Sequence, residues 1–422
     1  MAQQSRRTAY DREAARARYE ERRRQEKAAE EARRAKIRWR QEKLEESHQL
    51  ARGPIDLPFC LLVLLLTAIG LIMLLSASFP SAYYEARTNN DPLYYFVRQG
   101  IFAVAGVAAM FFISKINYQR FRGAAKFLMF LAIVLLVLVI VPGVGITRNN
   151  ATRWLGVGDL FTFQPSEIAK VAVVVYFSDS ISRKKDRMRT TRYGILPYLL
   201  IMGIIAVLMM LEPHLSGTVL ILGVGAILML VGGIRWTWVI AAVGFAGTVA
   251  ALMMSGIIKY GQSRIEMWQN PFIDASDKGY QLSQSLISIG SGGLLGVGLG
   301  KGRQKFLYLP EEHNDFIFAI VCEELGLIGA TIIMLLFAGL ILRGYWIALH
   351  ARDRFGTLLA VGVTSLIAMQ TFLNIGVVTG LLPTTGISLP FFSYGGTALM
   401  LQLAEMGIVL SVSRQMKPTK AG

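Results

Sequence analysis

The sequence is poor in cysteine, and this scarcity excludes a disulfide-stabilised fold. Cys60 and Cys322 are the 2 cysteines of the 422 residues. Both lie in apolar segments far apart in the chain, so we expect no disulfide, and nothing in the sequence resembles a metal-ligand spacing. The N-terminus is charged rather than apolar, so we also predict no cleavable signal peptide.

Residues 1–52 lack large apolar residues at heptad spacing, which argues against a stable coiled coil. They are rich in Arg, Glu, Ala and Gln, and Glu20–Ala35 places opposite charges three or four residues apart, a spacing that supports a solvated helix. We therefore predict a charged cytoplasmic N-terminal helical arm. It either contacts anionic lipid headgroups or docks a partner.

Long apolar runs dominate the rest of the chain. Hydrophobic residues make up 53% of the sequence, and its mean hydropathy is +0.46. Runs of about 18 to 20 residues suit a bilayer core of roughly 30 Å, so we predict an all-α polytopic membrane protein with about ten transmembrane helices, without an evident internal repeat. The spans are expected at 57–79, 95–114, 124–142, 165–182, 194–211, 215–233, 236–256, 314–342, 357–380 and 391–412.

The net charge is +16, and the basic residues concentrate in alternate loops between the apolar runs. This pattern indicates membrane topology, so we expect no nucleic-acid partner. The positive-inside rule places these loops and both termini in the cytoplasm. The transmembrane domain is expected at 53–415, with a large outer loop at 257–313 between spans seven and eight and a cytoplasmic tail at 416–422. The basic residues are Lys115, Arg120, Arg122 and Lys126; Arg183, Lys184, Lys185, Arg187, Arg189 and Arg192; Arg343, Arg352 and Arg354; and Arg414, Lys417 and Lys420.

Acidic residues near the spans are the first candidates for chemistry, because charge is costly in a membrane. Glu167 and Lys170 share one helix face at i, i+3 spacing; they either line a cavity or form an ion pair that lowers the cost of insertion or pins two helices. Asp315 stands where a polar loop meets the eighth span, and is either a general base or a helix N-cap. Glu323 and Glu324 lie deeper and either serve the reaction or pack as hydrogen-bonding residues, and the same alternative applies to Glu405 in the last span.

A basic set precedes Asp315 in the outer loop. Lys301, Arg303 and Lys305, with Arg264 further upstream, either hold a lipid diphosphate or belong to an ordinary solvated loop. Two irregular stretches accompany them. Gln281–Leu299 is Gly-rich and weakly amphipathic and is predicted to lie in the interface plane or to re-enter the bilayer. The prolines and glycines of Gly380–Leu399 break the chain beside the last span.

These segments together resemble the SEDS family, the shape, elongation, division and sporulation proteins such as FtsW and RodA, from about residue 57 to 413. Gly279–Gly326 follows the family pattern most closely. The segments ATRWLGVG (Ala151–Gly158), FQPSEIAK (Phe163–Lys170) and LPFFSYGG (Leu389–Gly396) agree in order and spacing. The sequence QKFLYLP at residues 304–310 favours the FtsW and sporulation branch.

The resemblance implies a peptidoglycan glycosyltransferase of the bacterial cytoplasmic membrane that polymerises lipid II, with a class B penicillin-binding protein transpeptidase and other division or elongation proteins as partners. It implies a divalent cation, Mg²⁺ or Mn²⁺, and no organic cofactor. The family's essential aspartate falls on Asp315. Substrate-binding positions fall on Glu167, Lys170, Arg153, Trp154, Pro310, His313 and Ser393, beside Arg264, Lys301, Arg303 and Lys305.

Three positions depart from the pattern. His214 stands where the family is expected to have aspartate, and Asn314 stands for threonine. Gly396–Ala398 reads GTA where Gly-Ser-Ser is expected. Two other functions fit the same residues: a lipid II flippase, which needs access from both membrane faces, and a non-catalytic division scaffold, in which the N-terminal arm matters most.

Overall fold

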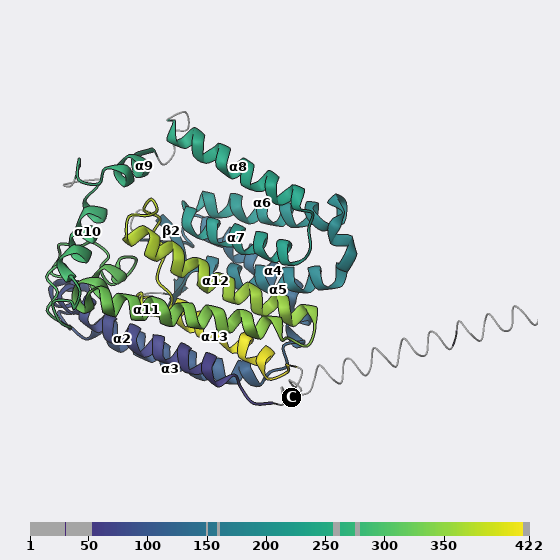
Figure 1. Ribbon diagram of the computed structural model, residues 1–422, viewed down its shortest axis with the longest axis horizontal. Coiled ribbons are helices and arrows are strands. Elements are labelled where there is room, and N and C mark those ends of the chain that lie inside the picture. Colours follow the sequence, from purple (N-terminus) through teal and green to yellow (C-terminus); the bar gives the residue numbers. More distant parts are fainter. Residues whose placement is uncertain are drawn as a thin grey trace, which may run out of the picture. The chain divides into compact units, whose positions relative to one another are not determined.

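The computed structural model describes residue 30 and residues 53–148, 151–157, 161–255, 262–274 and 279–416. The chain divides into two compact units, residues 1–50 and 51–422. The arm predicted at 1–52 lies outside the described residues apart from Glu30. The second unit is a bundle of helices with one small sheet (Figure 1).

Apolar runs form the helices at the predicted places, with some changes at their ends. The helices are α2 (Leu57–Tyr84), α3 (Tyr94–Lys115), α4 (Arg120–Ile140), α5 (Pro165–Lys184), α6 (Leu196–Leu211), α7 (Leu215–Val231), α8 (Trp236–Met254), α9 (Gln262–Gln269), α10 (Tyr280–Gly292), α11 (Ile317–Leu349), α12 (Arg354–Val378) and α13 (Gly396–Ser413), with short helical turns at Ala86–Thr88, Lys185–Arg189 and Thr191–Ile195.

Seven helical segments among the described residues are long and apolar enough to cross a membrane, and Leu215–Val231 is apolar but shorter. The prediction of an all-α polytopic membrane protein is therefore confirmed. The count of about ten spans and the cytoplasmic position of both termini stay predictions. The seven segments are Leu57–Tyr84, Tyr94–Lys115, Arg120–Ile140, Thr191–Leu211, Ile317–Leu349, Arg354–Val378 and Gly396–Ser413.

Two predicted spans begin a few residues later than expected, because irregular backbone replaces their first turns. The eighth predicted span, helix α11, begins at Ile317 rather than at 314. The last helix begins at Gly396 rather than at 391, since the preceding residues fold into a turn in which the amides of Phe392 and Ser393 both donate to the carbonyl of Leu389.

Residues 143–164, predicted as an outer loop, contain a three-stranded antiparallel sheet in the order β1 (Ile146–Arg148), β2 (Ala151–Val157), β3 (Phe161–Phe163). Trp154 of β2 pairs with Ile146. The hydroxyl of Thr397 donates to the carbonyl of Thr162 at 3.2 Å, which joins the sheet to the first turn of α13.

The basic loops gather at one end of the bundle, as the alternating charge predicts. Asp353, before α12, accepts hydrogen bonds from Tyr118, Gln119 and Arg122, all at the start of α4. Arg343 pairs with Asp56 at 2.8 Å. The sheet, α9 and α10 lie at the opposite end (Figure 1).

Helix α11 is broken at Gly326, whose φ of 67° and ψ of −171° are non-helical. The Gly-rich segment after α10 supplies hydrogen-bond partners for the backbone groups at the break. The amides of Val297 and Gly298 donate to the carbonyls of Glu323 and Glu324, and the amides of Leu327 and Ile328 donate to the carbonyls of Gly293 and Leu294. A Cβ on Gly326 would lie 2.2 Å from the nitrogen of Gly296, so this close approach requires glycine.

Candidate functional site

Asp315 lies where the start of α11 meets α12 and the segment before α13. The side-chain amide of Asn374, on α12, donates to the carbonyls of Asp315 and Ile387, each at 2.7 Å. A Cβ on Gly386 would lie 3.1 Å from the Oδ2 atom of Asp315. The N-cap position of α11 is Phe316, without a side-chain cap bond, so the alternative that Asp315 caps this helix is wrong.

The surroundings of Asp315 shift its pKa upward. Burial has the largest effect and, with the negative charge of Glu311, raises the pKa of Asp315 to about 6, against the opposing effects of Arg153 and His313. A carboxylate of this pKa is ionised at neutral pH and more basic than an ordinary aspartate. Such a group suits general base catalysis near pH 7.

The irregular segment before α13 holds the backbone next to Asp315 in place. The hydroxyl of Ser393 donates to the carbonyl of Asn314 at 2.7 Å, and the amide of Tyr394 donates to the carbonyl of His313 at 2.9 Å. Ser393, predicted to bind substrate, therefore engages the chain itself. The non-helical backbone at residues 389–393 is thus buried in protein, one of the two situations in which such backbone is tolerated at membrane depth.

His313 is held by ring contacts and by one acid. Its ring lies 4.7 Å from that of Tyr95, and its Nδ1 atom lies 3.3 Å from a carboxylate oxygen of Glu312. Pro310 is exposed, and its carbonyl lies 3.4 Å from the side-chain amide of Gln281. The two predicted substrate-binding residues thus border the loop that carries Asp315.

Strand β2 brings Arg153 to the same end of the bundle. Its guanidinium donates to the carbonyls of Glu212 (3.4 Å) and Pro213, in the turn between α6 and α7. The same cation lies close enough to lower the pKa of Asp315. Trp154, its neighbour on the strand, is partly buried.

Glu167 and Lys170 form an ion pair at 2.7 Å, with side-chain exposures of 12% and 5%. The charge of Lys170 also reaches His214 and Glu405, which belong to other elements. Burial, with help from Arg153 and Lys170, lowers the pKa of His214 to about 3, so its imidazole is neutral at pH 7. Glu167 and Lys170 thus form the predicted ion pair within one helix, α5, and their lining of a cavity stays a prediction.

The predicted basic set does not converge on one point. Lys305 is buried, and its ammonium donates to Glu324 at 2.7 Å and to Ser76 at 2.9 Å. Lys301 and Arg303 are exposed. Arg264 falls in α9, and its side chain lies outside the described residues.

Glu323 and Glu324 are packed hydrogen-bonding residues, which confirms that alternative. Glu323 accepts the amides of Arg303 and Gln304, and Glu324 accepts the amide of Gly302. The two acids fix the loop before Asp315. Their role shows no sign in the sequence, because the partners are some 20 residues away and meet only in the folded chain.

The described residues contain no group of three or more His, Cys, Asp or Glu side chains that could hold a metal ion. Mg²⁺ is commonly bound by one or two carboxylates together with substrate phosphates. The described part of the chain therefore offers no complete protein-made metal site.

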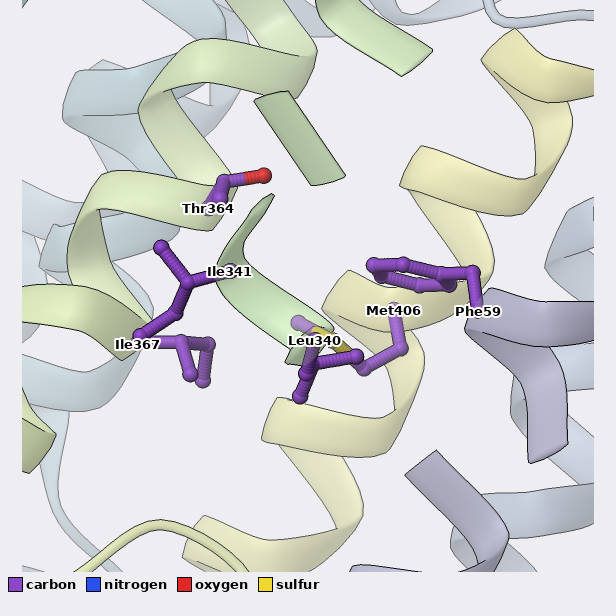
Figure 2. Close-up of a pocket in the computed structure, with 6 residues that line it drawn as sticks. All are labelled: Phe59, Leu340, Ile341, Thr364, Ile367 and Met406. Carbon is purple, nitrogen blue, oxygen red and sulfur yellow. The ribbon is translucent and has the colours of Figure 1, made fainter. Parts of the chain in front are cut away.

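A small cavity between α2, α11, α12 and α13 has a volume of about 10 Å³. Figure 2 shows that aliphatic, aromatic and thioether side chains surround it, with the hydroxyl of Thr364 at its edge. Sites for small molecules usually measure roughly 300–1,000 Å³ and carry several polar groups, so this cavity is a packing defect rather than a substrate site.

The comparisons with known proteins cover nearly all of the transmembrane domain. The family model for FtsW, RodA and SpoVE, described as cell cycle protein, matches residues 57–418. The chain is 44% identical over 362 residues to stage V sporulation protein E of Bacillus subtilis, covering 85% of this chain and 97% of that protein. It is 40% identical over 363 residues to a probable peptidoglycan glycosyltransferase FtsW of Geobacter sulfurreducens, covering 86% and 96%.

Two solved structures share the fold. A chain from the structure of a peptidoglycan synthase complex that coordinates polymerization and crosslinking has a TM-score of 0.71 and 26% identity, covering 86% of this chain and 98% of that one. The rod shape determining protein RodA of Thermus thermophilus has a TM-score of 0.64 and 25% identity, covering 87% and 99%.

Proposed function

This chain belongs to the FtsW, RodA and SpoVE family of cell cycle proteins, in the branch of FtsW and SpoVE, and we infer from this that it is a peptidoglycan glycosyltransferase of the cytoplasmic membrane. The alignment of this chain with relatives named probable peptidoglycan glycosyltransferase covers almost their whole length. The polyprenyl tails of the proposed substrate stay in the bilayer during the reaction, which explains why the enzyme is a multi-pass membrane protein.

The observation that carries the proposal is the position of Asp315. It stands just outside a membrane-spanning helix, partly buried, with a pKa raised to about 6 mainly by burial. In the proposed reaction, the carboxylate takes the proton from the sugar 4-hydroxyl of one lipid-linked disaccharide. The resulting oxygen nucleophile attacks the anomeric carbon of a second one, and the lipid diphosphate leaves with the bonding electron pair. A single displacement inverts the anomeric centre.

We propose that Arg153, whose guanidinium also donates to the carbonyls of Glu212 and Pro213, assists the leaving group. Its charge is felt by Asp315, and a guanidinium binds phosphate oxygens in a bidentate manner. Lys301 and Arg303, exposed on the loop before Asp315, add positive charge to the same face. Lys305 contributes indirectly, because its ammonium is committed to Glu324. A divalent cation bound through the diphosphate would supply further charge neutralisation.

The flippase alternative is less well supported by the arrangement of charge. Asp315, Arg153 and Lys301 lie at one end of the bundle, and the opposite end carries basic loops whose groups pair with Asp353 and Asp56. A transporter would need groups that serve its substrate from both faces. The scaffold alternative gives no reason for a carboxyl group with a raised pKa beside Arg153.

A partner with transpeptidase activity is part of the proposal. One structural neighbour is a chain of a peptidoglycan synthase complex that joins polymerization to crosslinking. We infer that this chain assembles in the membrane with a class B penicillin-binding protein, and with further division or elongation proteins.

Asp315→Asn tests the proposed base. In purified, reconstituted protein supplied with lipid II, we expect the rate of glycan polymerisation to fall by about 10²–10⁴-fold, the usual contribution of a general base. Asp91→Asn is the matched control, because Asp91 is an exposed acid in the loop between α2 and α3. Polymerisation at the wild-type rate by Asp315→Asn would remove Asp315 as the base, and lipid translocation without polymer would favour the flippase.

A further inference from the structure

Helix α10 buries its hydroxyl groups and exposes an apolar side chain. Ser285 and Ser288 are buried, and their hydroxyls donate to backbone carbonyls of α12 and α11 at 2.8 and 3.1 Å. The exposed residues of the helix are Ile287, Gly290 and Ser291, so its one large exposed side chain is apolar. A helix that faces water shows the reverse, with polar side chains outside. This arrangement is typical of a helix whose outer side meets an apolar medium.

The segment after α10 carries exposed leucines. Leu294, Leu295 and Leu299 are 66%, 80% and 52% exposed. The backbone of this segment is fixed to α11, because the carbonyl of Leu294 accepts the amide of Ile328 at 3.1 Å. Exposed apolar patches of this kind mark contact with a protein or with a membrane.

These leucines continue an apolar surface of α11. That helix is among the segments long and apolar enough to cross a membrane. Leu327, Ile328, Ile332 and Leu335 are each more than half exposed, and such side chains of a membrane-spanning helix face the acyl chains of lipids. Since Leu294 is hydrogen-bonded to Ile328, the leucines after α10 extend this lipid-facing surface and do not form a separate patch.

Two contacts along α2 show how deep the segment lies. Asp56 pairs with Arg343 at 2.8 Å at one end of α2, and the hydroxyl of Ser76 donates to Glu324 at 2.8 Å near its other end. The helix rises about 30 Å between Asp56 and Ser76 at 1.5 Å per residue, and a bilayer core is roughly 30 Å thick. The amide of Gly298 donates to the carbonyl of Glu324, so the segment lies at the far edge of the acyl region.

Basic and aromatic side chains follow the leucines. Lys301 and Arg303 are exposed, as are Phe306 and Tyr308. Long basic side chains reach lipid headgroups from an apolar surface, and aromatic side chains gather at the boundary between acyl chains and headgroups. Lysine is depleted at protein–protein interfaces, so this set favours a lipid surface over a protein partner.

We propose that α10 and residues 293–303 anchor the loop before α11 in the lipid bilayer. The three leucines enter the acyl region of the leaflet on the side of Asp315, and Lys301 and Arg303 lie level with its phosphate groups. The anchor holds residues 301–315 at the height of the headgroups. The diphosphate of a lipid-linked sugar lies at that height because its tail is in the bilayer, so the anchor sets the distance between Asp315 and the substrate, and this last step rests on the proposed function.

The first test measures the depth of Leu295. A bimane label on Leu295→Cys, in full-length protein reconstituted into liposomes of phosphatidylethanolamine and phosphatidylglycerol, should lose most of its fluorescence to lipids that carry a nitroxide near the top of the acyl chain, and little to iodide in the water. Labels on Leu335→Cys and Asp91→Cys are the controls. The first should respond best to a nitroxide near the end of the acyl chain, and the second to iodide. The wild type, whose cysteines are both buried, gives the background signal.

Two results would overturn the anchor. One is quenching of the Leu295→Cys label by iodide to the same extent as the Asp91→Cys label. The other is protection of the Leu295→Cys label only after a class B penicillin-binding protein is added, which would assign the surface to that partner instead of to lipid.

The second test measures the effect on the reaction. Leu294→Ala with Leu295→Ala removes apolar surface from the anchor, and Leu335→Ala with Leu342→Ala removes matched surface, 65% and 68% exposed, from the span. We expect the first pair to raise the KM for lipid II about tenfold, which corresponds to about 1.4 kcal/mol, and the second pair to keep it within about twofold of the wild type.

An unchanged KM in the first pair would overturn the proposed effect of the anchor on the substrate. Failure of the wild type to polymerise lipid II, with the Leu295→Cys label still quenched by lipid, would refute the proposed function and support the anchor, which separates the two.

Discussion

Asp315 owes its chemical character to neighbours that come from three different parts of the chain. Asn374 holds its backbone carbonyl, Glu311 and burial raise its pKa, and Arg153 and His313 limit that rise. The two charges of opposite sign, Glu311 and Arg153, act on the same carboxylate. Changing one of them should therefore move the pH range of activity in a direction that can be stated in advance.

Glu311→Gln should shift the acid limb of the polymerisation rate to lower pH. Asp315 must be ionised to accept a proton, so the rate rises as pH passes upward through its pKa of about 6. Removal of the Glu311 charge lowers that pKa, by roughly one unit or less for a single charge near a protein surface. The measurement is the maximal rate against pH; a limb that does not move would contradict the assigned effect of Glu311.

At the scale of elements, the loop before α11 is fastened to the helix by buried charge. Lys305 and Glu324 have side-chain exposures of 4% and 0%. Loss of one partner from a buried pair leaves an uncompensated charge, which costs about 3–5 kcal/mol. This loop carries Asp315, so its attachment matters for the site.

Lys305→Met should therefore lower the free energy of unfolding by about 3–5 kcal/mol, seen as a lower melting temperature in detergent. Lys305→Met combined with Glu324→Gln should recover part of that loss, because the neutral amide leaves no uncompensated charge while its oxygen can still accept the amide of Gly302. A raised KM for lipid II at unchanged melting temperature would instead support a direct role of Lys305 in substrate binding.

The sequence predicts the elements better than it predicts their partners. Long apolar runs and flanking charges are local features, so the helices were expected within a few residues of their actual bounds. The three strands near Arg153 were missed because two of them span only three residues. The site was predicted through Asp315, but the pairing of Lys305 with Glu324 and the contact of Arg153 with the turn at Glu212 depend on tertiary packing, which no local pattern reveals.

For the molecule as a whole, charge divides between two ends. The basic loops meet around Asp353 and Asp56 at one end, and the proposed site occupies the other. Gly53, the first residue of the described transmembrane unit, accepts a hydrogen bond from Arg414 at 3.0 Å. Residues near the first and last described positions of the transmembrane unit are thus joined by a hydrogen bond within that unit.

Deletion of residues 1–52 should leave polymerisation of lipid II at the wild-type rate, because the residues proposed for the reaction all belong to the transmembrane domain. The measurement is the glycan length distribution from reconstituted protein with and without the arm. A deletion variant that polymerises normally but does not support growth would assign the arm to partner or lipid contacts. Loss of polymerisation by a correctly inserted variant would contradict this division of roles.

The interruption of α11 at Gly326 gives the Gly-rich loop after α10 a mechanical role. Segment Gly293–Gly298 donates hydrogen bonds to carbonyls on one side of the interruption and accepts hydrogen bonds from amides on the other side. These bonds set the angle between the two halves of the helix. Asp315 stands near the tip of the shorter half, roughly 15 Å away at 1.5 Å per residue. A tilt of about 10° at the interruption would carry the carboxylate roughly 2–3 Å, so the hydrogen bonds of Gly293–Gly298 fix the position of Asp315 as well as the course of the helix.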